Sequence, residues 1–171
     1  MRERVKLVLY LTASYPSVQK FKEIIEKTRS IVDMFEIGVP TVNPKYDGPT
    51  IRMTYREAEI KGLEAIKTLP AITSDFTVMS YLEDHLHHFE DFVNLVKSLS
   101  AKSILLPDLL FDYYDYIDLY VKLKKKYGVE PSFFISSKFP YRVVRKLLTY
   151  SPLFIYLGLQ ASSGIKLPLL V

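Results

Sequence analysis

Cysteine is absent from the 171-residue chain, and this excludes disulfides, thiolate nucleophiles and zinc sites built on cysteine. A chain without disulfides is typical of a reducing compartment, so we expect a cytoplasmic location. Long apolar runs are lacking as well, because Thr12 and Ser14 interrupt the first one soon after it begins. Neither a signal peptide nor the roughly 20 apolar residues of a membrane helix can be recognised. We therefore expect no membrane association.

Charge of one sign is concentrated only in a short lysine run. The net charge is +4, and basic residues are otherwise scattered among acidic ones. The run from Lys122 to Lys126 falls on one predicted helix face and lacks the stacking aromatics of a nucleic-acid surface. With 49% apolar residues the chain is typical of a globular domain, and we expect no nucleic-acid binding. The mild positive balance suits a small phosphorylated substrate.

Short β-rich runs alternate with amphipathic segments along the chain. This alternation predicts an α/β fold with a parallel sheet covered by helices. No G-x-G-x-x-G turn follows the first run, which argues against a dinucleotide-binding fold. The alternation does not separate an open doubly wound sheet from a barrel, but both carry their chemistry at the carboxyl ends of the strands. The predicted strands span residues 5–11, 31–39, 76–81, 103–107, 132–135 and 153–157.

A carboxylate stands near the end of the second predicted strand, in the otherwise apolar run MFEIG. Burial of Glu36 is costly unless the group is paired or its pKa is shifted. The alternative is a side chain that reaches solvent beyond the strand end. Asp47 follows in an Asp-Gly-Pro loop, where the alternative is a simple turn. Together the two carboxylates favour one small-molecule site with two roles, proton transfer and a fixed anion that accepts a hydrogen bond.

Two further clusters are assigned to structure rather than function. His85, His87 and His88 could bind a stray divalent ion, but we favour a solvated polar face and predict no metal site. The tract DYYDY, residues 112–116, has helical spacing that puts its tyrosines partly on the core face. Packing is therefore its predicted role.

Three motifs follow the order and spacing seen in the tryptophan synthase alpha subunit family. They are YLTASYP from residue 10, FEIGVP from residue 35 and YDGPTI from residue 46. Tyr81, the segment LPDL from residue 106, and the pair Ser163-Gly164 match further positions after later strands. The chain resembles this family over essentially its whole length, and its archaeal members most. The resemblance implies a (β/α)8 TIM barrel, of which about six β/α units are present in a single incomplete domain, residues 1–171.

The resemblance also implies a carbon–carbon lyase that cleaves indole-3-glycerol phosphate to indole and glyceraldehyde 3-phosphate in tryptophan biosynthesis. Glu36 would move protons between the glycerol hydroxyl and indole C3. Asp47 would accept a hydrogen bond from the indole N–H and stabilise the cationic indolenine. The positions that match substrate-binding residues are Tyr10, Met79, Tyr81, Leu105, Ser163 and Gly164, and core packing is the alternative for the first four.

No cofactor is implied in this chain; pyridoxal phosphate is expected in a beta-subunit partner that consumes the indole. Three positions depart from the family pattern: Ser14 replaces glycine, Ser163 replaces threonine, and Asn43 replaces an aspartate in a loop used against the beta subunit. A complete barrel typically needs about 200 residues or more. The family's main phosphate-binding residues follow strands seven and eight, so we expect this sequence to be a fragment. Two alternatives stay open: a non-catalytic alpha-like subunit that activates a beta subunit, and another phosphosugar-handling β/α barrel.

Overall fold

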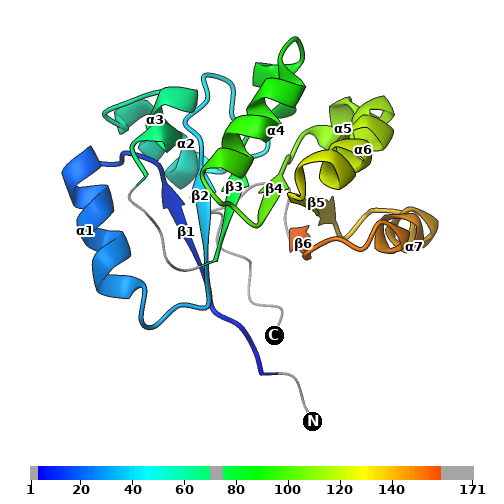
Figure 1. The fold of residues 1–171 in the computed structure, drawn as a ribbon, viewed down its shortest axis with the longest axis horizontal. Helices are drawn as coiled ribbons and strands as arrows, with labels where there is room; N and C mark the ends of the chain where they lie inside the picture. The colour runs from blue at the N-terminus through cyan, green and yellow to red at the C-terminus, as the bar shows by residue number, and fades with distance from the viewer. Residues whose placement is uncertain (1–3, 70–74, 159–171) are drawn as a thin grey trace.

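The computed structural model describes residues 4–69 and 75–158. Its strands form one sheet in chain order, and every neighbouring pair is parallel. In Figure 1 the helices lie along the outer side of this curved arc of strands. The predicted α/β fold with a parallel sheet is therefore confirmed. The strands are β1 (Val8–Thr12), β2 (Met34–Gly38), β3 (Phe76–Met79), β4 (Ser103–Leu105), β5 (Glu130–Ser136) and β6 (Ile155–Gly158).

Helices connect successive strands, as the sequence pattern predicts. The sequence after β2 predicts one helical segment up to about Gly62, but in the structure the first helix ends at Glu57 and a separate short helix begins at Leu63. Gly62 between them has a φ of +59°, a backbone conformation that interrupts helical structure. The helices are α1 (Val18–Thr28), α2 (Pro49–Glu57), α3 (Leu63–Lys67), α4 (Phe89–Ser98), α5 (Leu109–Asp112), α6 (Ile117–Tyr127) and α7 (Tyr141–Thr149), with 3-10 turns η1 (Leu82–His85) and η2 (Tyr114–Tyr116).

The main core lies between the sheet and the helices. On β2, Phe35 and Ile37 belong to this core, while Glu36 between them points to the other face. Helix α1 contributes Phe21 and Ile25 to the same core. The strands thus bury one set of alternating side chains under helices and leave the other set for the concave side of the sheet. No helix in the described part of the chain has the length and apolar character needed to cross a bilayer.

Individual residues account for the start of α1, for the end of α6 and for the serine at position 14, where the family typically has glycine. Ser17 caps α1, since its hydroxyl accepts a 3.2 Å hydrogen bond from the amide of Lys20. Gly128 ends α6 in the left-handed conformation, with a φ of +67°. Ser14 also has a positive φ of 59°, where glycine is the easier residue. Its hydroxyl bonds both the carbonyl and the amide of Ile60, at 2.9 and 3.0 Å, and these bonds help to hold that conformation.

Candidate functional site

Glu36 lies on the concave side of the sheet, away from solvent. Only 5% of its surface is exposed. Its neighbours at the same level are Tyr10 on β1 and Thr77 on β3. The alternative in which this side chain reaches solvent beyond the strand end is therefore wrong. Glu36 is a carboxyl group fixed on rigid backbone among buried side chains.

Asp47 lies in the loop that joins β2 to α2. The residue is 6% exposed, and Oδ2 accepts a 3.0 Å hydrogen bond from the hydroxyl of Tyr81. Arg52 on α2 donates through Nε to the backbone carbonyl of Asp47 at 2.8 Å. The amide of Asp47 donates to the carbonyl of Pro44 at 3.2 Å, so a turn does precede the residue. The simple-turn alternative accounts for the backbone at Asp47. It does not account for the side chain, because the buried carboxylate accepts a hydrogen bond from Tyr81.

Both carboxyl groups have raised pKa values, and the charge of Asp47 acts on the protonation of Glu36. Burial raises the pKa of Glu36 from 4.5 to about 7, and the charge of Asp47 adds to the rise. Burial likewise raises the pKa of Asp47 from 3.8 to about 6, opposed by the Tyr81 hydrogen bond and by the charge of Arg52. Glu36 can therefore exchange a proton near neutral pH, while the Tyr81 hydrogen bond and the charge of Arg52 favour the ionised form of Asp47. The environment of Asp47 suits a fixed anion, and the environment of Glu36 suits proton transfer.

Apolar and aromatic side chains gather around these carboxyl groups. They form a cluster separate from the helix-facing core, made of Tyr55, Met79 and Leu105, with Tyr10, Ile51, Phe134 and Phe154 packed against it. The structure thus brings together three of the predicted pocket residues, Tyr10, Met79 and Leu105, and Tyr81 joins the site through Asp47. Apolar and aromatic side chains beside a carboxylate are suited to an aromatic ring with an N–H group. That these residues bind substrate stays a prediction. Ser163 and Gly164 lie outside the described residues, so their predicted part stays a prediction as well.

Gly38 makes room for two hydroxyl groups in this cluster. A Cβ atom at Gly38 would overlap the Tyr10 hydroxyl and lie 2.9 Å from the hydroxyl of Tyr55. Those two hydroxyls form a 3.2 Å hydrogen bond, with Tyr10 as the donor. The glycine in FEIGVP is therefore required by close packing at the end of β2.

A cavity of about 400 Å³ opens between the first two strands and β6. Tyr10 and Glu36 line one side of it, and Phe154 and Tyr156 line the other. Burial and then the charges of Glu36 and Asp47 raise the pKa of Tyr156, so this side chain lies within electrostatic reach of both carboxyl groups. The volume falls within the range of about 300–1,000 Å³ that is usual for small-molecule sites.

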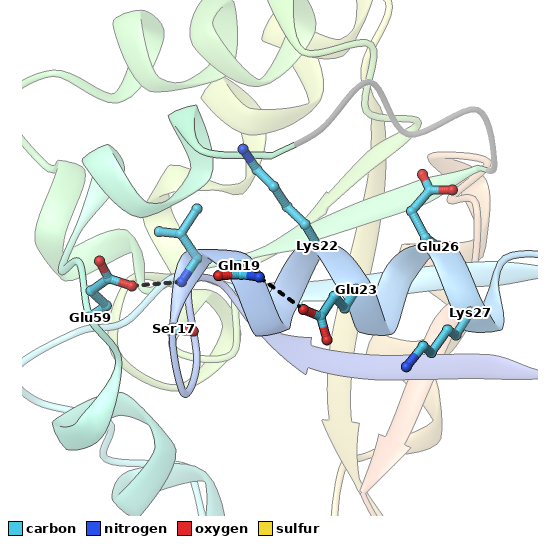
Figure 2. Close-up of a pocket in the computed structure, with 8 residues that line it drawn as sticks. Ser17, Gln19, Lys22, Glu23, Glu26, Lys27 and Glu59 are labelled. Carbon is cyan, nitrogen blue, oxygen red and sulfur yellow. Dashed lines mark hydrogen bonds between the residues drawn. The ribbon is translucent and has the colours of Figure 1, made fainter.

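A second hollow does not belong to this site. A groove of about 800 Å³ runs along α1. Its lining side chains are drawn in Figure 2, and at one end the Glu59 carboxylate accepts a 2.7 Å hydrogen bond from the amide of Val18. Acidic and basic side chains are mixed along the groove, so no charge of one sign converges on a point. It includes none of the predicted site residues. The lining residues are Ser17, Val18, Gln19, Lys22, Glu23, Glu26, Lys27 and Glu59.

The histidine cluster needs one correction. His85 is 4% exposed, its ring stacks on that of Phe92 with centroids 3.9 Å apart, and Nε2 lies 2.8 Å from the hydroxyl oxygen of Ser80. Burial lowers the pKa of His85 to about 4. The solvated-face hypothesis is wrong for this residue because the segment forms a 3-10 turn that directs it to the core; His87 and His88 are exposed. The described residues contain no group of His, Asp and Glu side chains able to hold a metal ion.

Comparison with known proteins identifies the family. The family described as tryptophan synthase alpha chain matches residues 1–166. The tryptophan synthase alpha chain of Saccharolobus solfataricus is 36% identical over 170 residues, which cover 96% of this chain and 69% of the relative. This chain belongs to the tryptophan synthase alpha chain family. The alpha chain of Sulfurisphaera tokodaii is 32% identical over 173 residues, covering 98% of this chain and 71% of that relative.

Solved structures of tryptophan synthase share the fold. A mutant alpha subunit from Pyrococcus furiosus superposes with a TM-score of 0.81 at 20% identity, over 95% of this chain and 68% of that one. A Mycobacterium tuberculosis tryptophan synthase chain gives 0.77 at 22% identity, over 90% and 62%. The predicted barrel architecture is therefore confirmed for the described residues, which form a six-stranded part of it. This chain spans about two thirds of the length of these tryptophan synthase chains.

Sequence reasoning missed several aromatic residues that this member of the alpha chain family places near its carboxyl groups. They are Tyr55, Phe134, Phe154 and Tyr156. A signal for Phe134 was available, because Phe133 beside it faces the helices and side chains alternate along a strand. Tyr55 had no comparable signal, since helical spacing alone does not reveal which side of α2 meets the concave face of the sheet.

Proposed function

We propose that the protein is a tryptophan synthase alpha subunit that cleaves indole-3-glycerol phosphate into indole and glyceraldehyde 3-phosphate. The single observation that carries the proposal is the buried pair Glu36 and Asp47 beside an aromatic cluster at the carboxyl ends of parallel strands. Family membership adds support, since the relatives carry the name of this subunit.

In the proposed reaction, protonated Glu36 first donates its proton to C3 of the indole ring. Positive charge then develops on the ring nitrogen, whose N–H donates to the Asp47 carboxylate, and a fixed anion at that place stabilises the charge. Ionised Glu36 next removes the proton from the hydroxyl group on the side-chain carbon bonded to C3. The carbon–carbon bond breaks, its electron pair restores the aromatic ring, and a carbonyl forms. Glu36 ends protonated, as it began.

A pKa of about 7 suits a group that acts as acid and then as base near neutral pH. The chemistry requires no metal or cofactor in this chain. We propose a beta subunit that carries pyridoxal phosphate as the partner that consumes the indole.

Indole release by the full-length protein tests the proposal. We expect wild-type protein to form indole from indole-3-glycerol phosphate, and Glu36→Gln to lose about 10²–10⁴-fold in kcat. Wild-type activity in the Gln variant would make Glu36 a structural residue. A wild-type protein that forms no indole but still activates a beta subunit would favour the non-catalytic alternative. Cleavage of a different sugar phosphate would favour the other barrel enzymes.

A further inference from the structure

The two residues before Asp47 join its loop to two other strand-end segments. The ammonium group of Lys45 forms ion pairs with Glu83 on η1 at 2.8 Å and with Asp112 on α5 at 2.9 Å. The hydroxyl of Tyr46 donates to the other carboxylate oxygen of Asp112 at 2.9 Å. One aspartate thus binds both residues, although it lies 67 positions from Lys45 in the sequence.

Aromatic stacking holds the same loop. The ring of Tyr46 stacks on two others. Its centroid lies 6.4 Å from that of Tyr81, with 7° between the ring planes, and 4.8 Å from that of Phe111, with 28° between the planes. Stacked aromatic pairs stabilise a contact beyond the burial of their surface. The side chain of Tyr46 is therefore fixed both by its ring and by its hydroxyl.

These contacts lead directly to the carboxylate of Asp47. The backbone amide of Tyr46 donates to the hydroxyl oxygen of Tyr81 at 2.9 Å, and the same hydroxyl donates to Asp47 at 3.0 Å. On the other side of the loop, Arg52 donates to the carbonyl oxygens of Lys45 and Asp47 at 3.1 and 2.8 Å. A loop without regular structure is thus anchored at each residue from 45 to 47.

We propose that Lys45 and Tyr46 are positioning residues that clamp the loop onto η1 and α5 and so hold the Asp47 carboxylate in place for the ring N–H. The inference rests on the proposed function for the role of Asp47. Its physical basis is that misplacement by about 1 Å can cost about 10²-fold in rate. Half-exposed ion pairs contribute little to global stability. The hydrogen bonds that Lys45 donates to Glu83 and Asp112 raise its pKa, so its ammonium group stays charged near neutral pH.

Steady-state kinetics of indole release by the full-length protein test the clamp. Lys45→Met should lower kcat by about 10–100-fold with little change in KM. Lys45→Arg, which keeps the charge, should restore most of the rate. In an Asp47→Asn background Lys45→Met should have almost no further effect, because a residue that acts through Asp47 cannot act without it.

Lys124→Met is a matched control. Lys124 pairs with Glu130 at 2.7 Å with side-chain exposures of 21% and 40%, close to the 33% and 36% of Lys45 and Glu83. Glu130 begins β5, so this pair lies at the amino end of a strand, whereas Asp47 follows the carboxyl end of β2. We expect this variant to retain the wild-type kcat.

Hydrogen exchange at the amide of Tyr46 gives a readout that does not depend on activity. Exchange should accelerate in Lys45→Met and stay unchanged in Lys124→Met. An unchanged kcat and unchanged exchange in Lys45→Met would overturn the clamp, as would a loss of kcat that is equally large in the Asp47→Asn background. If wild-type protein forms no indole, the proposed function fails, and the exchange measurement alone then retains or overturns the clamp.

Discussion

Replacement of Glu36 by Gln should make the protein more stable while it lowers kcat by about 10²–10⁴-fold. Glu36 is buried without an ion-pair partner among the described residues, and its pKa is raised from 4.5 to about 7. A raised pKa means that the folded state holds the proton more tightly than the unfolded state. Stability therefore falls as pH rises from 4.5 to about 7, and the full cost is present above that pH. Gln is similar in shape and carries no charge, so it removes this cost.

The magnitude follows from the two pKa values. The difference between 4.5 and about 7 corresponds to roughly 3–4 kcal/mol, at about 1.4 kcal/mol for each pKa unit. For a protein of about 150–250 residues this raises Tm by about 7–14 °C. The gain should be largest near pH 8 and should vanish below about pH 4.5, where the carboxyl is protonated in both states.

Chemical denaturation of the full-length protein at several pH values measures this effect, and indole release measures activity beside it. Glu57→Gln on the exposed end of α2 is the matched control, with an expected change in the free energy of unfolding within about 0.5 kcal/mol. A Gln variant at position 36 that is less stable than wild type near pH 8 would refute the reasoning, because Glu36 would then be a paired structural group.

Three other predictions follow from the site. Asp47→Asn should lower kcat by about 10²–10³-fold, because it removes the anion that stabilises the charged ring. It should not lower Tm near neutral pH, because it removes a buried charge. Kinetics and thermal unfolding together check this, and a Tm drop large enough to explain the lost activity would mean that Asp47 is only a structural turn residue. Gly38→Ala should destabilise the fold by about 1–3 kcal/mol because its Cβ would displace the hydroxyl of Tyr10; an unchanged free energy of unfolding would contradict the packing argument. Alanine at Asn43 or Pro44 should weaken stimulation by a purified beta subunit more than the basal rate, since both lie before the clamped residues in the loop; titration of the beta subunit tests this, and equal losses in both rates would leave the loop without a part in coupling.

Periodic patterns in the sequence were sufficient to predict the strands and their parallel sheet. The strands of this part of the barrel were predicted within a few residues, because apolar runs and turn residues alternate strongly. The burial of Glu36 was left open by the sequence, because alternation places it on the face opposite Phe35 and Ile37 but does not say whether that face is covered. The order of the strands in space needed the family resemblance, because alternation alone is shared by open sheets and barrels.

Contacts between loops could not be predicted from the sequence. Asp112 was assigned to a packing tract, and nothing in its neighbourhood indicates that Lys45 and Tyr46 would bind it. His85 was misjudged for a related reason: a short 3-10 turn changes the face on which a residue lies, and helical spacing does not report it. These features depend on which loops the fold brings side by side.

Proton transfer to indole C3 is the central claim, and exchange of the C3 hydrogen of free indole in D2O tests it most directly. Proton NMR follows the C3 signal, and the measurement needs only the ring pocket, Glu36 and Asp47. We predict that the full-length wild-type protein accelerates the loss of this signal, that Asp47→Asn slows it, and that Glu36→Gln reduces it to the rate without protein. Equal exchange by wild type and Glu36→Gln would contradict the assignment of Glu36 as the group that carries the proton.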